Sequence, residues 1–414
     1  MTEKNKFIKD LNTLINDYLT EKDIKEYIES VVQAFSPHMT FGSSDDLFSS
    51  YFKDAVLSEK VRLLTDTLIT YVKGVFTPKK YNEFLLQFGK ILLNQGENDL
   101  AYDIATMVLN YSENVKDMDN FRGEAYLLVA EFHMRQAIWK DSLTAIKKAR
   151  DIFEEKNYKD GLGKCEFLIG SLYVQKGELK AGSIRLKHCF KYINEKKNPL
   201  LTAMVEVNMG IIFFIEGKMN ESLDLYNKAL SKFELLGDTR RKTEVLQNIG
   251  MIYRNQKKYN SAIQIYDECI DIAGQFGYQP ILNLCFCNKA EIYLEQGDLE
   301  EAFNFAQKSL VLSYQLNDKL TLADIHKMLG VIALKKRNFS SAENFLLTSL
   351  RLNQDLNQEL NCAETNYQLG VLYKTKGNKS QAHNYLLNAF KFYNKNQSKT
   401  IASEIESHLS SLTG

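Results

Sequence analysis

The side chains best suited to nucleophilic or metal chemistry are scattered along this 414-residue sequence. Six histidines stand at positions 38, 133, 188, 326, 383 and 408, and six cysteines at 165, 189, 269, 285, 287 and 362. Nucleophilic catalysis would need a Ser or Cys close to a His and an orienting carboxylate. No G-x-S-x-G, H-E-x-x-H or Gly-rich phosphate loop accompanies these residues. The neighbours His188 and Cys189 are the nearest approach to a catalytic pair.

A structural role explains each of these candidates. Cys189 falls on a position that small residues occupy at a fixed interval, described below. Asp45 and Asp46 fit the capped start of a helix. The sequence has no C-x-x-C, and Cys285 and Cys287, two residues apart, point in different directions on a helix. We therefore expect buried, reduced thiols, no catalytic residue, no metal and no cofactor.

Composition excludes several further classes of protein. Lys+Arg and Asp+Glu balance at 52 each, so nucleic acid is not expected as a partner, and the basic segment 147–197 is interpreted as a solvated face. Only four prolines occur, which favours an all-helical chain. The apolar stretch Met209–Ile215 is far shorter than the ~20 residues that cross a bilayer, and the amino terminus has no signal-peptide core. A cytoplasmic protein without membrane contact is the expectation.

A repeat of fixed length sets the positions of the candidate side chains. Small residues recur 40 residues apart, and we call them the marker residues: Gly170, Gly210, Gly250, Ala290, Gly330 and Gly370, with Ala130 and Gly89 upstream. Three residues after most markers stands an aromatic ring, as in Tyr253 and Tyr293. Twelve and nineteen residues after them stand further small residues, as in Ala262 and Cys269. This arrangement indicates helices that cross closely.

Each repeat contains two helical patterns joined by a short polar turn. Apolar residues recur at helical spacing in 241–256, and again on one face of the segment after the turn "NQKKYN". Because one helix pair cannot bury its own apolar face, neighbouring pairs must stack into a continuous core.

These features resemble the tetratricopeptide repeat. The motif positions are matched by Asn248, Ile249, Gly250, Tyr253, Ala262 and Tyr266. The 40-residue period exceeds the usual 34, as in the long-helix repeats of the Pins/LGN adaptors and of Rap-type peptide receptors of bacteria. Lys289 before a marker, Gly182 and Ser222 in the alanine position, and the missing closing proline depart from the pattern. The resemblance implies an all-α, right-handed superhelical solenoid of antiparallel helix pairs.

The two ends do not follow the period. Residues 1–80 contain two amphipathic helical patterns, a loop around "SPHMTFGSSDD" with Ser44 or Asp45 as N-cap, and further helix to about Val75. We predict a small helical bundle there, with irregular leading repeats as the alternative. Residues 81–397 hold about eight repeats, and 398–414 a capping helix whose stripe is Ile401, Ile405, Leu409 and Leu412.

The resemblance also implies that the first helix of each repeat lines a concave groove. Its groove positions are six and three residues before the marker residue and one and four after it. The residues predicted to bind a ligand there, with the asparagines two before the marker, are Met204, Val207, Asn208, Ile211, Phe214, Gln247, Asn248, Met251, Arg254, Leu284, Asn288, Glu291 and Lys327.

Two features of this set allow two interpretations each. Residues 200–217 are apolar nearly all round, so Met204, Val207, Ile211 and Phe214 are either covered by the protein itself or act as anchors for a peptide or partner helix. Asn208, Asn248 and Asn288 form a ladder at repeat spacing. Their amides either clamp the backbone of an extended peptide or bond within the scaffold.

We therefore predict a non-enzymatic scaffold or adaptor that binds a protein or peptide in its concave groove. One alternative is a Rap-type peptide-sensing regulator that acts on an effector through residues 1–80. The other is an obligate structural subunit of a larger assembly, and self-association is left open.

Overall fold

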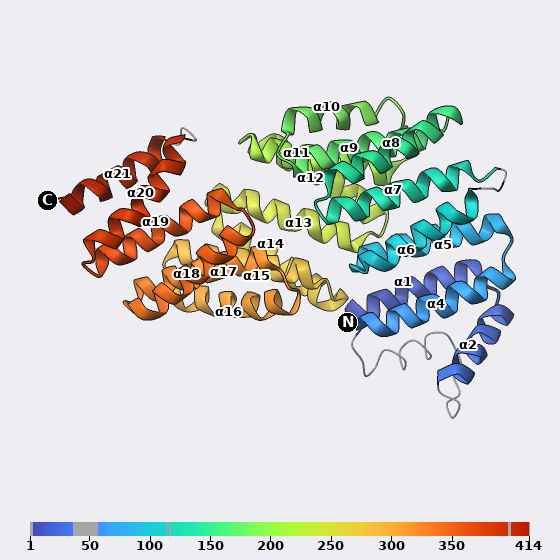
Figure 1. Ribbon diagram of the computed structural model, residues 1–414, viewed down its shortest axis with the longest axis horizontal. Helices are drawn as coiled ribbons and strands as arrows, with labels where there is room; N and C mark the ends of the chain where they lie inside the picture. The colour runs from blue at the N-terminus through green and yellow to red at the C-terminus, as the bar shows by residue number, and fades with distance from the viewer. Residues whose placement is uncertain (1–2, 36–56, 114, 116, 396–398, 414) are drawn as a thin grey trace. The chain divides into compact units, whose positions relative to one another are not determined.

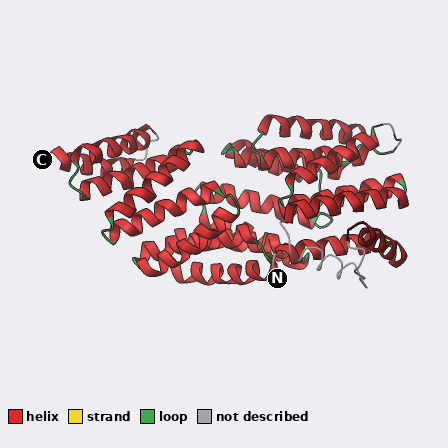
Figure 2. Ribbon diagram, turned by 60° about the horizontal axis from the view of Figure 1, so that its bottom comes forward, coloured by secondary structure: helices red, strands yellow, loops and turns green. Residues whose placement is uncertain are grey.

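The computed structural model describes residues 3–35, 57–113, 115, 117–395 and 399–413, and the regular elements in those ranges are all helices (Figures 1 and 2). The chain begins with α1 (Glu3–Tyr18), α2 (Glu21–Phe35) and α4 (Leu57–Val75). The N-cap predicted at Ser44 or Asp45 lies outside the described residues. The following helices are α5 (Pro78–Gln95), α6 (Asn98–Ser112), α7 (Asp119–Arg135), α8 (Trp139–Glu155), α9 (Lys159–Gln175), α10 (Leu179–Cys189), α11 (Pro199–Ile215), α12 (Met219–Leu235), α13 (Thr239–Asn255), α14 (Tyr259–Phe276), α15 (Gln279–Gln296), α16 (Leu299–Gln315), α17 (Lys319–Lys335), α18 (Phe339–Asp355), α19 (Glu359–Thr375), α20 (Lys379–Lys395) and α21 (Lys399–Thr413).

Consecutive helices pack as antiparallel pairs, α7 with α8 and α17 with α18 among them, which confirms the predicted all-α solenoid. The chain divides into two compact units. Unit 1 consists of the chain up to Val245 with Gln275–Gly277, and unit 2 of Leu246–Gly274 with the chain from Tyr278 onward. The boundary between the units falls within α13, the first helix of a repeat.

The amino-terminal helices of unit 1 share a core with the first helix pair. Helices α1 and α4 both pack against α5. Tyr27 from α2 and Phe84 and Phe88 from α5 are fully buried in one apolar cluster with residues of α1, α4 and α6. The apolar faces predicted for residues 1–80 are therefore covered by the start of the repeat array.

Each glycine among the marker residues has a large side chain from the second helix lying against it. A Cβ added to Gly210 or Gly250 would come within 2.6 Å of the ring of Tyr226 or Tyr266, sixteen residues further on. The repeat with Ala290 at this position has the small Ala306 sixteen residues later, and both are fully buried. Close helix crossing thus depends on the combined size of the two side chains.

In two repeats, serine replaces alanine twelve residues after the marker without leaving a polar atom unpaired. The hydroxyl of Ser142 donates to the carbonyl of Ala130 at 3.0 Å, and that of Ser222 donates to the carbonyl of Gly210 at 2.8 Å. Each bond links the second helix to the marker residue of the first. The departure noted at Ser222 is therefore compensated, because the buried hydroxyl is satisfied.

The C-terminal helix α21 covers the last repeat by a slightly different stripe from the predicted one. Ile405 and Leu412 are buried and Leu409 packs beside the same cluster, but Ile401 is 40% exposed and Ala402 is buried instead. Adjacent residues lie about 100° apart on a helix, so only one of these two can face α20. The smaller side chain takes the close contact.

A left-handed residue ends almost every helix in the repeats. Positive φ recurs at 20-residue intervals, at positions 137, 157, 177, 217, 237, 257, 277, 297, 317, 337, 357 and 377. At Ala137 (φ 56°) the following N–H, of Ile138, donates to the His133 carbonyl at 2.9 Å, which closes a Schellman turn. This conformation favours glycine, yet several repeats use alanine, asparagine or a charged residue.

Replacing Ala137 with glycine should therefore raise the free energy of unfolding of unit 1 by about 1 kcal/mol, because glycine adopts this backbone without a Cβ penalty. Chemical denaturation followed by circular dichroism measures the change. The reverse substitution, Gly177→Ala, should cost a similar amount, since Gly177 has a φ of 77°. A loss of stability in Ala137→Gly would contradict this account of the turn.

Candidate functional site

The candidate site is the face of the first helices that carries the predicted groove positions, called here the inner face. Successive first helices pack directly against one another, α7 with α9 and α9 with α11 in unit 1, and α15 with α17 and α17 with α19 in unit 2. The predicted residues on α11 belong to unit 1, and those from Gln247 onward belong to unit 2. Each unit therefore has its own inner face.

In unit 1, α11 carries apolar side chains on two sides. Ala203, Val205 and Ile212 are buried in the stack. The side chains that form the α11 patch are all partly exposed: Met204, Val207, Ile211 and Phe214. Met204 and Ile211 also touch the adjoining core cluster, so the patch continues from the core to the surface.

The asparagine ladder is used largely within the scaffold. The Asn208 amide donates to the carbonyl of Met204 at 3.0 Å, one turn back on its own helix. Asn366 on α19 repeats this bond, to the carbonyl of Cys362 at 2.7 Å. Asn288 is buried, and its carbonyl oxygen accepts from Arg254 at 3.3 Å, whereas Asn248 is half-buried. Two members of the ladder thus already have scaffold partners.

Polar residues on the inner face of unit 2 pair between successive first helices. Arg254 forms an ion pair with Glu291, and Lys327 with Glu364, each 37 residues apart in the sequence. Tyr367 donates to Glu404 at 2.7 Å with the same separation. Gln247 is buried, Met251 is half-buried and Leu284 is 40% exposed. A polar ligand on this face would have to compete with these internal pairs.

The Lys327 ammonium forms ion pairs with two carboxylates, those of Asp324 and Glu364. Burial alone would lower the pKa of Lys327, but the carboxylates of Glu364 and Asp324 outweigh it and hold the pKa above its usual value. Burial raises the pKa of Asp324, although Lys327 opposes the shift. Lys327 therefore stays charged at neutral pH and binds its two carboxylates together.

The inner face of unit 1 has a charged cluster that the sequence analysis did not select. Glu124 on α7 lies between Lys90 of α5, at 3.4 Å, and Lys164 of α9, with which it forms a close ion pair. Burial would raise the pKa of Glu124, but the two lysines outweigh it and lower the pKa. Glu124 and Lys164 stand six residues before Ala130 and Gly170. The same position rule, applied to the earlier repeats, would have found them.

Among the described catalytic candidates, Cys189 is unsuited to nucleophilic catalysis. Cys189 is fully buried, its thiol lies 3.2 Å from the Gly163 carbonyl, and burial raises its pKa to about 12. Such a thiol stays protonated at neutral pH and is a poor nucleophile. Asp45 and Asp46 lie outside the described residues. In the described part of the chain, no three His, Cys, Asp or Glu side chains gather closely enough to hold a metal ion.

None of the described helices combines the length and apolar character needed to cross a membrane.

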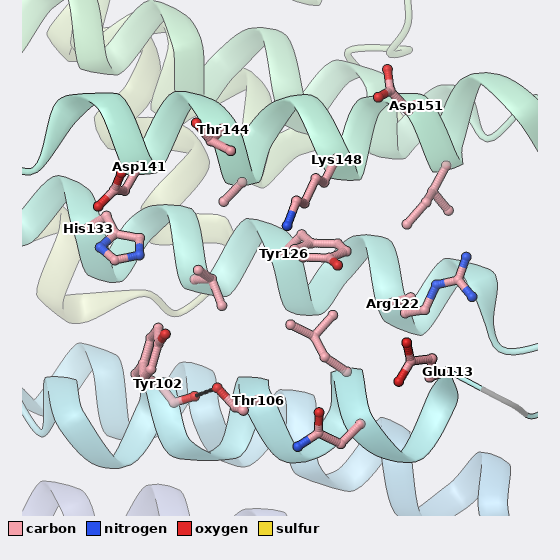
Figure 3. A pocket seen from close by; sticks show the side chains of 15 residues that line it. Tyr102, Thr106, Glu113, Arg122, Tyr126, His133, Asp141, Thr144, Lys148 and Asp151 are labelled. Carbon is pink, nitrogen blue, oxygen red and sulfur yellow. Dashed lines mark hydrogen bonds between the residues drawn. The ribbon is translucent and has the colours of Figure 1, made fainter.

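A separate cavity lies on the outer side of unit 1. It has a volume of about 740 Å³ and runs between the second helices α6 and α8, with the first helix α7 as its floor (Figure 3). We call it the α7 furrow. Tyr126 and His133 project from α7, Tyr102 from α6 and Lys148 from α8 (Figure 3). The sequence analysis did not predict this cavity.

Comparison with known proteins finds tetratricopeptide repeats in this chain. One model of this repeat matches residues 201–275, and a second matches residues 285–314 and 363–396. The chain is 22% identical over 270 residues to the kinesin light chain-related protein 2 of Arabidopsis thaliana. That alignment covers 53% of this chain and 40% of the relative, so the chain spans less than half of the relative's length.

Solved structures share the fold at low sequence identity. A Rap protein complexed with competence and sporulation factor superposes with a TM-score of 0.55 and 12% identity over 80% of this chain and 97% of the Rap chain. The signal-transduction ATPase with a tetratricopeptide repeat sensor from Pyrococcus horikoshii gives 0.53 and 15% over 98% of this chain and 66% of the other. The apo quorum sensor NprR of B. thuringiensis gives 0.52 and 16% over 84% and 98%.

Proposed function

We propose that this chain, which is built of tetratricopeptide repeats, is a non-enzymatic scaffold that binds an apolar segment of another protein on its inner face. The α11 patch carries the proposal. Its four apolar side chains, on a helix whose other side is already buried in the stack, are partly exposed. Burying them against a partner would be favourable by roughly 25 cal/mol for each Å² of apolar surface removed from water.

The predicted groove residues of unit 2 would give that unit a contact surface of its own, separate from the α11 patch. In unit 2, Gln247 and Arg254 lie on the inner face with Leu284, which exposes an apolar side chain. Arg254 is engaged with Glu291 and Asn288, so it would serve a ligand by exchanging these bonds rather than by supplying an unused charge. Specificity would then come from how well the polar groups of a ligand replace the internal pairs that they displace.

A second candidate is a peptide-sensing regulator of the Rap type. The superposition on a Rap protein complexed with competence and sporulation factor favours it, as does the likeness to a quorum sensor. In this case residues 1–80 would form the effector-binding bundle, residues 81–397 the peptide-binding repeats and 398–414 the cap. Because α1 and α4 share a core with α5, a change in the stacking of the first pairs would reach the amino-terminal helices directly.

Phe214→Asp tests the proposed inner-face site. We expect at least a tenfold loss of the partner that wild type retains from a native lysate, because a carboxylate cannot enter an apolar contact without a large desolvation cost. Each partner is identified by mass spectrometry and the melting temperature is measured in parallel. Leu235→Asp, at a side chain that is 89% exposed, is the matched control.

Three outcomes are informative. Loss of the partner with Phe214→Asp alone, at an unchanged melting temperature, supports the site. Equal retention by both variants excludes the α11 patch as the binding surface. A fall of more than about 4 °C in melting temperature would instead show that Phe214 is a core residue.

A further inference from the structure

The α7 furrow is open because a small side chain stands at a repeat position that larger side chains fill in the later repeats. Ala145 stands fifteen residues after the marker Ala130 and lines the cavity. At the same distance from their markers, the later repeats carry large side chains: Arg185, Leu225, Ile265, Phe305, Phe345 and Tyr385. Two of them lie flat on the ring three residues after the marker, Phe305 on Tyr293 at 5.6 Å and Tyr385 on Tyr373 at 5.4 Å.

The repeat of α15 and α16 shows how a filled furrow is built. Phe305 lies between Phe286 and Tyr293, with ring centroids 6.1 and 5.6 Å away. Lys308 places its ammonium 4.8 Å from the Phe305 ring, and the buried Lys289 reaches it at 4.3 Å. A ring at this place is therefore held by two aromatic neighbours and by cations over its face.

The furrow over α7 has three of the four surrounding side chains without the central ring, and Val129 stands where α15 has Lys289. Tyr126 stands where α15 has Phe286, His133 where it has Tyr293, and Lys148 where α16 has Lys308. Lys148 lies over the Tyr126 ring at 5.3 Å, as Lys308 lies over Phe286 at 5.6 Å. Both rings and one of the two lysines of the ring site thus have counterparts in unit 1, and Ala145 leaves its centre empty.

We infer that the α7 furrow binds an aromatic side chain of a partner polypeptide, which takes the place that Phe305 occupies in its own repeat. This site goes beyond the proposed inner-face site and does not depend on it. The ring would stack beside His133 and Tyr126, under the Lys148 ammonium.

The length of the furrow fits a polypeptide rather than a free ring. The floor residues Arg122 and His133 stand eleven residues apart on α7, so the furrow extends about 16 Å along the helix, enough for roughly five residues of extended chain.

The probe for this site is N-acetyl-4-fluorophenylalanine amide, followed by fluorine NMR line broadening on the full chain. We expect saturable broadening at millimolar probe with wild type and at least fivefold weaker binding of N-acetyl-leucine amide, which lacks a ring to stack. Wild type that does not broaden the probe, or binds both amides equally, would overturn the inference.

Ala145→Phe is the decisive variant, because it supplies the missing ring from within the chain. Probe binding should fall at least tenfold, while the melting temperature stays at or above that of wild type. Phe305→Ala in unit 2 is the converse: it should add a second site and double the bound probe at saturation. Unchanged binding in a folded Ala145→Phe protein would disprove the assignment.

If Ala145→Phe does not fold, Lys148→Ala and His133→Ala decide the question. Each removes one wall, and we expect about threefold weaker binding of the aromatic probe in each variant with little effect on the leucine probe. Wild-type binding by both variants would reject the site. Because neither residue lies on the α11 patch, the result is independent of the Phe214→Asp experiment.

Discussion

Gly250→Ala should lower the free energy of unfolding of unit 2 by about 2–3 kcal/mol, although it adds only one methyl group. The new Cβ would lie 2.6 Å from the Tyr266 ring, which is fully buried and cannot move aside without displacing its neighbours. Denaturant unfolding followed by circular dichroism, with hydrogen exchange of α13 and α14, measures the loss. The effect should be confined to unit 2.

A double-mutant cycle distinguishes this clash from an ordinary backbone effect. In a Tyr266→Ala background, Gly250→Ala should cost almost nothing, because the repeat with Ala290 and Ala306 already accommodates two alanines at these positions. Gly274→Ala is the matched control, since a Cβ there meets no atom within 4 Å, and it should be neutral or slightly stabilising. A cost for Gly250→Ala that is the same in both backgrounds would contradict the packing explanation.

The same relation between the sizes of packed side chains explains why the repeat could be predicted from the sequence. Helix formation, turns and close crossings are governed by side chains within about 20 residues of one another, and their pattern returns at each marker. Helix α21 (Lys399–Thr413) lies in the segment predicted to cap the array, 398–414. Even the departure at Lys289 has a local cause, because its ammonium pairs with Asp267 and lies over the Phe305 ring.

The inner face was harder to predict because its contacts depend on how one pair stacks on the next. The resemblance to tetratricopeptide repeats predicts Arg254 and Lys327 as polar groove residues, but not that Glu291 and Glu364 pair with them. Likewise, the periodicity of Asn208 cannot show that its amide turns back to its own helix. Whether the α11 patch holds a partner stays a prediction.

The α7 furrow was missed for a different reason. The repeat pattern is defined by the residues that the repeats share, whereas the furrow depends on a residue in which one repeat differs. Ala145 is an ordinary helix residue when it is considered alone. The role of Ala145 becomes clear only by comparison with the large side chains at the matching positions and from the cavity beside it. A systematic search for the position where one repeat lacks what the others have would have identified it.

Lys164→Met should destabilise unit 1 by about 2–3 kcal/mol at pH 7, because it leaves the mostly buried Glu124 carboxylate with Lys90 alone, at 3.4 Å. In wild type the pKa of Glu124 is lowered, so its contribution is present above the usual carboxyl range and is lost as the pH falls through the folded pKa. The pKa of Lys164 is raised, so its contribution is lost only at strongly alkaline pH.

The difference in stability between wild type and Lys164→Met should therefore be nearly constant from about pH 6 to pH 10. It should shrink below about pH 5, because Glu124 takes up a proton first in the variant, where Lys90 alone opposes the effect of burial, and only at lower pH in wild type. Urea unfolding at several pH values measures it. Lys180→Met, at an exposed lysine one helix away, should have little effect. Adding Glu124→Gln to Lys164→Met should recover most of the loss, because the uncompensated charge is then gone. A difference that persists unchanged at pH 4 would mean that Lys164 acts through its packed aliphatic stem rather than through its charge.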